Sequence, residues 1–188
     1  MGLNMIELTK AKDILCKPEL EKGYNKYVFI MQKLHKTNVA LDKDFQIQYD
    51  GFYRVRRSEM FRKKYFEIME ELKNNNEVDF ATIFEHVKNI RGTCELSFSS
   101  KLIHTLNPTY PIWDSIVTKT HFNIAVPYFY KENKAQLCCE SYELYKSEFI
   151  EYMKTEEAKE LVNMFNKAFP NNSITNIKKI DFILWQYR

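Results

Sequence analysis

Apolar residues recur at intervals of three and four along most of this 188-residue chain. That spacing is typical of α-helices with one buried face, whereas a half-buried strand alternates apolar and polar residues. Such alternation is never sustained, and four glycines and five prolines supply little material for the tight turns of a sandwich or barrel. The sequence therefore predicts an all-α fold. At this length we expect a single globular multi-helix domain over residues 1–188, with roughly eight or nine helices.

Residues that favour helix ends lie beside the periodic segments. Pro18 suits the first turn of a helix that runs to about Lys36, and Gly92 suits the end of another helix. Side chains that can cap a helix start precede five further segments: Ser58, Asp79, Asp114 or Ser115, Thr155, and Ser173 or Thr175.

Three of the expected helices are defined by their length, their end or their apolar content. One is expected over Glu95–Leu106, broken before Pro108, and a long one from Lys131 to about Met153. The segment from Ile177 to Trp185 is too apolar to lie loose in water, so it predicts a buried C-terminal helix.

The composition indicates an aromatic core and no membrane segment. Aromatic residues make up 15% of the chain, with twelve tyrosines and fourteen phenylalanines. No apolar run approaches the roughly 20 residues of a transmembrane helix. The first residues, MGLNMIELTKAKD, lack the basic-then-apolar order of a signal peptide. We therefore expect a cytoplasmic protein that does not bind membranes.

No cofactor or metal signature is present. The four cysteines and four histidines lack the spacing of a metal site, and no phosphate-binding loop or dinucleotide fingerprint occurs. We expect no metal and no cofactor, and the cysteines are expected to be reduced thiols that fill small apolar spaces.

A basic segment, residues 51–64, carries six cationic side chains and one carboxylate, Glu59. Arginine forks match phosphate oxygens, so the segment favours contact with DNA or RNA. The structural alternative is a solvated helix face balanced by Glu67, Glu70 and Glu71. The alternative function is a non-enzymatic helical interaction module whose basic face binds an acidic partner. The cationic residues are Arg54, Arg56, Arg57, Arg62, Lys63 and Lys64.

Lys101 and Asp114 form a second candidate site. Lys101 borders the apolar stripe of its helix, and apolar surroundings make a lysine easier to deprotonate and more nucleophilic. The turn over residues 107–113 reverses the chain, so Asp114 can return towards the helix that bears Lys101. The structural interpretation is that Lys101 extends to water while Asp114 caps its helix.

Two resemblances rest on these residues. Nearly the whole chain resembles a family of uncharacterised bacterial proteins through FYxVRR at residues 52–57, SFxSKL at 97–102, PIWD at 111–114 and KxDFxLW at 179–185. Residues 79–122 are similar to the core of helix–hairpin–helix DNA glycosylases. That similarity implies that Lys101 attacks the sugar C1′ and that Asp114 stabilises the cationic sugar or activates the attacking group. The expected function is therefore nucleic-acid binding with glycosylase-like chemistry, while enzymatic activity and oligomeric state stay open.

Overall fold

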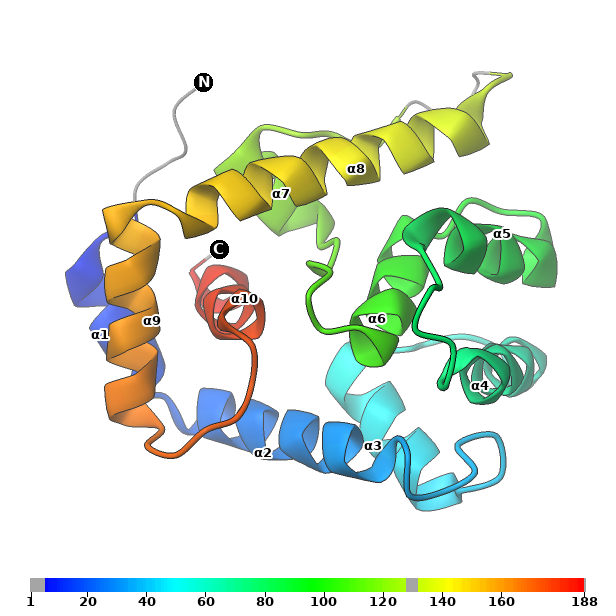
Figure 1. Cartoon of the computed structure of the whole chain (residues 1–188), viewed down its shortest axis with the longest axis horizontal. Coiled ribbons are helices and arrows are strands. Elements are labelled where there is room, and N and C mark those ends of the chain that lie inside the picture. The colour runs from blue at the N-terminus through cyan, green and yellow to red at the C-terminus, as the bar shows by residue number, and fades with distance from the viewer. Residues whose placement is uncertain (1–5, 128–131, 188) are drawn as a thin grey trace. The chain divides into compact units, whose positions relative to one another are not determined.

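The computed structural model describes residues 6–127 and 132–187, and within these ranges the chain forms ten α-helices and no strand (Figure 1). The predicted all-α class is confirmed, with more helices than the sequence suggested. In chain order they are α1 (Leu8–Leu15), α2 (Pro18–Lys33), α3 (Lys43–Tyr53), α4 (Glu59–Leu72), α5 (Phe80–Arg91), α6 (Leu96–Leu106), α7 (Ser115–Phe122), α8 (Lys134–Met153), α9 (Glu156–Ala168) and α10 (Asn176–Gln186).

The predicted helix caps are confirmed. Ser58, Asp79 and Thr155 each accept a hydrogen bond from the backbone N–H three residues later. Of the two candidates before the last helix, Thr175 is the cap. Gly92 ends α5 in the left-handed conformation, with φ of 70°. Local side-chain chemistry thus sets most helix starts. Helix α8 begins at Lys134, and the predicted start, Lys131, lies outside the described residues.

Two helices, α1 and α3, were not predicted. Helix α1 is only eight residues long, and its N-cap, Glu7, makes no side-chain capping bond. Helix α3 starts normally, because Asp42 accepts a hydrogen bond from the Phe45 N–H. Its buried residues are one per turn (Phe45, Tyr49 and Tyr53), and Gly51 interrupts the pattern. So sparse an apolar stripe is a weak helix signal.

The chain divides into two compact units. Unit 1 comprises residues 1–21 and 108–188, and unit 2 comprises residues 22–107, so α2 begins in unit 1 and continues in unit 2. The single domain over residues 1–188 stays a prediction. Unit 2 contains 15 lysines and arginines against 11 aspartates and glutamates, a net charge of +4, whereas unit 1 has 13 against 14, a net charge of −1. The positive charge of the protein therefore belongs to unit 2.

Unit 2 is built around aromatic side chains. Helix α5 packs against α6 and α4, and α4 also contacts α6 (Figure 1). The ring of Tyr49 lies at the centre, 4.6 Å from the ring centroid of Tyr53, 5.5 Å from Phe66 and 5.9 Å from Tyr65. Both Tyr49 and Tyr65 are fully buried. The expectation of a core made largely of rings is confirmed here.

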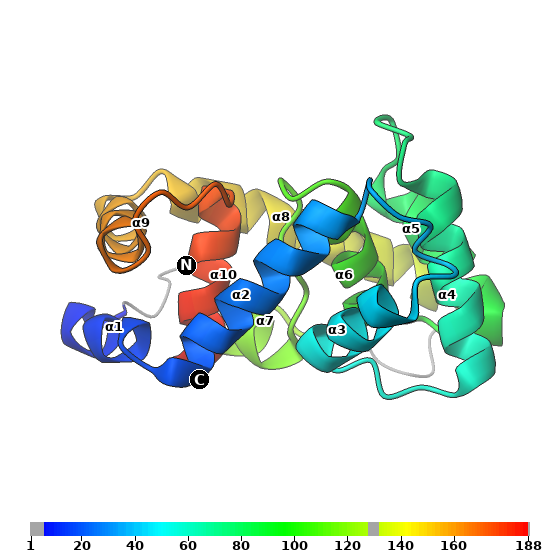
Figure 2. The same ribbon diagram turned by 90° about the horizontal axis from the view of Figure 1, so that it is seen from below.

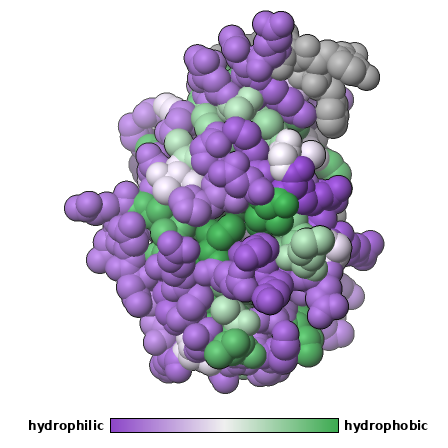
Figure 3. Space-filling model, turned by 90° about the vertical axis from the view of Figure 1, so that its right-hand side faces the viewer, coloured by the Kyte–Doolittle hydropathy of each residue, from purple (hydrophilic) through white to green (hydrophobic). Residues whose placement is uncertain are grey.

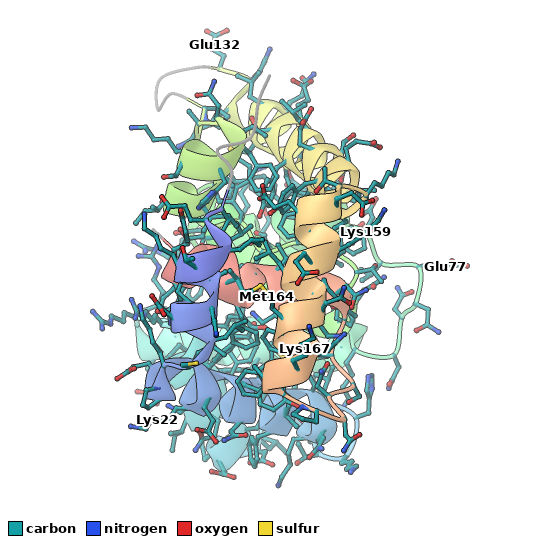
Figure 4. All side chains as sticks on the ribbon, turned by 90° about the vertical axis from the view of Figure 1, so that its left-hand side faces the viewer. Lys22, Glu77, Glu132, Lys159, Met164 and Lys167 are labelled. Carbon is teal, nitrogen blue, oxygen red and sulfur yellow. The ribbon has the colours of Figure 1, made fainter. Side chains whose placement is uncertain are left out.

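Unit 1 packs α1, α9 and α10 on one another (Figure 2), and α7 packs against α8 (Figure 1) and also contacts α10. Figure 4 shows Lys159 and Lys167 along α9, whose opposite residues, Leu161 and Phe165, are buried. Burial of the C-terminal helix is confirmed, because the middle of α10 has almost no exposed surface. None of the ten described helices combines the length and apolar character that crossing a bilayer requires.

Candidate nucleic-acid interface

The basic segment of residues 51–64 spans the end of α3, its connection to α4 and the start of α4, all within unit 2. Arg54 terminates α3 in the left-handed conformation, with φ of 55°. The backbone N–H groups of Arg54 and Val55 both donate to the Asp50 carbonyl, and the Val55 side chain is buried. Arg54 and Arg56, on either side of Val55, are exposed. The connection is therefore anchored by one apolar side chain and presents two arginines to solvent.

Three of the six predicted cations already have acidic partners. Arg57 Nη2 lies 3.0 Å and 2.9 Å from the two carboxylate oxygens of Glu95. Arg62 Nη1 lies 2.9 Å from Asp50 Oδ2, and Lys64 Nζ lies 3.1 Å from Glu67 Oε2. Of these acids only Glu67 was expected. Glu95 lies 38 residues from Arg57 in the sequence and is brought to it by tertiary packing. No local sequence pattern predicts such a pair.

Arg56 and Lys63 are exposed and form no ion pair with any described residue. They are the cations of the basic segment most available to an external anion, and Arg54 is exposed as well.

A groove of about 170 Å³ runs between α3 and α4, with Ile47 and Phe66 among its lining residues. We call it the α3–α4 groove. The Arg62–Asp50 ion pair lies in its wall. Burial raises the pKa of the Asp50 carboxyl, while the hydrogen bond and charge of Arg62 act in the opposite direction. Asp50 Oδ1 and Arg62 Nε are buried and form no hydrogen bond within the described residues, so the pair is neutralised but not fully hydrogen-bonded.

Helices α5 and α6 form a hairpin whose turn covers residues 92–95. The turn is held from two sides, since Glu95 accepts from Thr93 Oγ1 at 3.1 Å as well as from Arg57. Lys101 lies on the second helix of this hairpin, half-exposed, with its Nζ 5.1 Å from the centroid of the Phe98 ring. This cation–π contact places the amine beside apolar surface, as the sequence predicts.

Asp114 is the N-cap of α7, as predicted. Its carboxylate accepts hydrogen bonds from the backbone N–H groups of Ile116 at 3.0 Å and Val117 at 3.2 Å. Asp114 belongs to unit 1 and Lys101 to unit 2. The joint catalytic role of the two side chains therefore stays a prediction.

Comparison of the chain with protein-family models, curated proteins and solved structures found no match. The two resemblances drawn from the sequence accordingly stay predictions. Within residues 6–127 and 132–187, no group of three or more His, Cys, Asp or Glu side chains could hold a metal ion.

A chain of buried hydroxyl groups holds the Lys101 helix to the rest of unit 2. Tyr65 donates a hydrogen bond to the Phe98 carbonyl at 2.8 Å, and the hydroxyl oxygens of Tyr65 and Tyr49 are 2.9 Å apart. Thr105 Oγ1 donates to the Lys101 carbonyl at 2.7 Å and lies 3.5 Å from the Tyr49 hydroxyl. Burial raises the pKa of both tyrosines well above the usual value. These interactions fix α6 against α3 and α4, and no pattern in the sequence predicts them.

Buried His104 also supports α6. Its Nε2 lies 3.1 Å from the Tyr27 hydroxyl, which belongs to α2. The sequence predicts a partly buried histidine bonded to a backbone carbonyl, whereas the structure buries His104 fully and gives it a tyrosine hydroxyl as a partner. This interaction gives His104 a structural role.

Proposed function

We propose that this protein binds nucleic acid through the exposed cations of the α3–α4 connection. The observation that carries the proposal is the pair Arg54 and Arg56, both exposed on either side of buried Val55. Guanidinium groups bind phosphate oxygens through paired hydrogen bonds, and an ordered backbone reduces the entropy lost when they do. The unit that carries them has a net charge of +4, which attracts a polyanion over a longer range.

The α5–α6 hairpin extends this surface. Because Arg57 binds Glu95, the basic connection and the hairpin turn are tied together within one unit. Arg91, in the last turn of α5, is exposed beside that turn. A duplex that contacts Arg54 and Arg56 therefore has a further cation of the same unit available to its phosphates.

A salt series tests the binding. Labelled single- and double-stranded DNA and RNA would be titrated with the protein at several ionic strengths by fluorescence anisotropy. We expect affinity to fall steeply with salt, and replacing Arg54 and Arg56 together with alanine to reduce the slope of log K against log salt by about 2, one per phosphate contact. The matched control replaces Lys12 and Lys167, two exposed lysines of unit 1, with alanine and should leave the slope unchanged. Failure of all four nucleic acids to bind at low salt would refute the proposal.

Glycosylase-like chemistry is the finer form of the proposal. The Lys101 amine would attack C1′ of an abasic sugar, the C1′ oxygen would leave as water, and an imine would form that borohydride reduces to a stable amine. We expect wild-type protein to be trapped on abasic DNA and the Lys101→Ala variant not to be trapped. Wild-type protein that binds abasic DNA without any trapped product would limit the function to binding.

The non-enzymatic alternative uses the same arginines. A helical module that binds an acidic protein would depend on Arg54 and Arg56 but would not bind DNA or RNA at low salt. The salt series therefore separates the two functions before any partner is known.

A further inference from the structure

Hydrophobic residues reach the surface of this protein in several places among hydrophilic ones (Figure 3). The three most exposed large hydrophobic residues of the described chain are Leu41, Ile47 and Met60, at 74%, 67% and 74% exposure. The other exposed ones reach only 40–52%. All three lie in α3, in α4 or in the turn that precedes α3. Exposed apolar residues gathered on one pair of helices are typical of an interaction surface.

The α3–α4 groove lies among these residues. Helix α3 lines it with positions 43, 46, 47 and 50, and α4 lines it with positions 59, 62, 63 and 66. Each set has the spacing i, i+3, i+4, i+7, which forms one continuous stripe on a helix. Ile47 is itself a lining residue, and Met60 follows the lining residue Glu59. The groove is thus a shallow seam between two helices of the kind that receives a third helix.

The charges that line the groove indicate which kind of partner it does not favour. Three cations (Lys43, Arg62 and Lys63) and two acids (Asp50 and Glu59) line it, so its net charge is +1, in contrast to the +4 of unit 2. A nearly neutral wall attracts phosphate or a strongly acidic protein only weakly.

Glu59 and Lys63 lie one turn apart on α4, and neither forms an ion pair within the described residues. A two-fold axis brings each patch against its own copy and makes the two copies of α4 antiparallel. In that arrangement the acid of each copy faces the base of the other.

We propose that a second copy of this chain docks on the α3–α4 groove, with the two α4 helices antiparallel. Glu59 of each copy pairs with Lys63 of the other, and Ile47 and Met60 become buried between them. The dimer uses Lys63 of the basic segment but neither Arg54 nor Arg56, the two arginines on which the proposed nucleic-acid contact rests.

Sedimentation equilibrium of the full chain tests the proposal. Wild-type protein should be dimeric at about 100 µM and dissociate towards about 1 µM, as small interfaces do. Ile47→Glu should weaken the dimer at least tenfold, because it places a carboxylate in the apolar centre. The matched control is Ile150→Glu, an exposed isoleucine of α8 in unit 1, which should leave the dimer unchanged.

A charge swap makes the test specific to the pairing. Glu59→Lys and Lys63→Glu should each weaken the dimer, because each places like charges opposite one another, and the double variant should restore most of the loss. Circular dichroism would confirm that each variant is folded.

Wild-type protein that stays monomeric throughout, or a dimer that tolerates Ile47→Glu, would overturn the proposal. The proposal would also be overturned if the Glu59→Lys, Lys63→Glu double variant dimerised more weakly than either single variant. Loss of DNA binding in Ile47→Glu without loss of the dimer would assign the groove to nucleic acid instead and overturn it as well.

Discussion

The buried hydroxyl chain between Tyr49, Tyr65 and Phe98 allows a quantitative test of what holds the Lys101 helix in place. The Tyr65 proton is committed to the Phe98 carbonyl at 2.8 Å, so the Tyr49 hydroxyl must be the donor in the 2.9 Å contact between the two tyrosines. Removal of the Tyr65 oxygen by Tyr65→Phe breaks both bonds. It leaves the fully buried Tyr49 hydroxyl with only a 3.5 Å contact to Thr105 Oγ1.

The two single variants should therefore differ in cost. Tyr65→Phe leaves a buried donor without an acceptor, and we expect it to lower the free energy of unfolding by about 2 kcal/mol. Tyr49→Phe removes one bond while Tyr65 still donates to Phe98, and it should cost about 1 kcal/mol. In the double variant no hydroxyl is left unsatisfied, so its cost should be about 2 kcal/mol, less than the sum of the single costs by about 1 kcal/mol.

Urea unfolding followed by far-UV circular dichroism measures these differences, with an unchanged m-value as the condition for comparison. Tyr187→Phe serves as the control, because its hydroxyl accepts a bond from the Glu7 N–H at an exposed site where water can replace it. That variant should change stability by less than about 0.5 kcal/mol. Strictly additive costs, or a larger loss for Tyr49→Phe than for Tyr65→Phe, would refute the assigned direction of the chain.

Two further predictions concern pH and the α7 cap. Stability should fall as pH rises above about 10, because the unfolded chain then loses tyrosine protons that the folded protein keeps; each buried tyrosine contributes about 1.4 kcal/mol per pH unit. A pH series of urea unfolding checks this, and a flat profile up to about pH 11 would contradict the raised pKa values of Tyr49, Tyr65, Tyr142 and Tyr145. Asp114→Ala should cost about 1 kcal/mol through loss of the cap, whereas Asp114→Asn, which can still accept both N–H bonds, should cost little. Equal losses in thermal or urea unfolding would show that the charge, and not the cap, is what stabilises α7.

Local chemistry could be predicted from the sequence, and tertiary pairing could not. Ser58, Asp79 and Asp114 cap helices because each accepts hydrogen bonds from backbone N–H groups two or three residues away. The sequence predicted six cations available to a nucleic acid, because the acids that pair with Arg57 and Arg62 are brought to them only by tertiary packing. Asp50 pairs with Arg62 across the α3–α4 groove, and α3 itself was not predicted.

The Lys101 and Asp114 site shows the same limit. The sequence correctly placed Lys101 beside Phe98 on one helix and Asp114 at the start of the next. Each of these two side chains interacts with residues no more than one helical turn away. The hydroxyl chain that fixes α6 joins residues 16 and 33 positions apart, and nothing in the local pattern of tyrosines distinguishes a hydrogen-bonded pair from two rings that merely fill space.

The division of the chain into one continuous unit and one made from both ends has a consequence for the order of synthesis. Unit 2 is complete once residue 107 has emerged from the ribosome, so its hydroxyl chain and aromatic core can form while translation continues. Of the described helices, α1 emerges first, but it packs against α9 and α10, which begin at residues 156 and 176. At a synthesis rate of about 5–20 residues per second, the apolar face of α1 stays uncovered for on the order of ten seconds before α9 and α10 are made. The first of the described helices to be made is therefore among the last to be packed, and its apolar face is open to wrong contacts in the meantime.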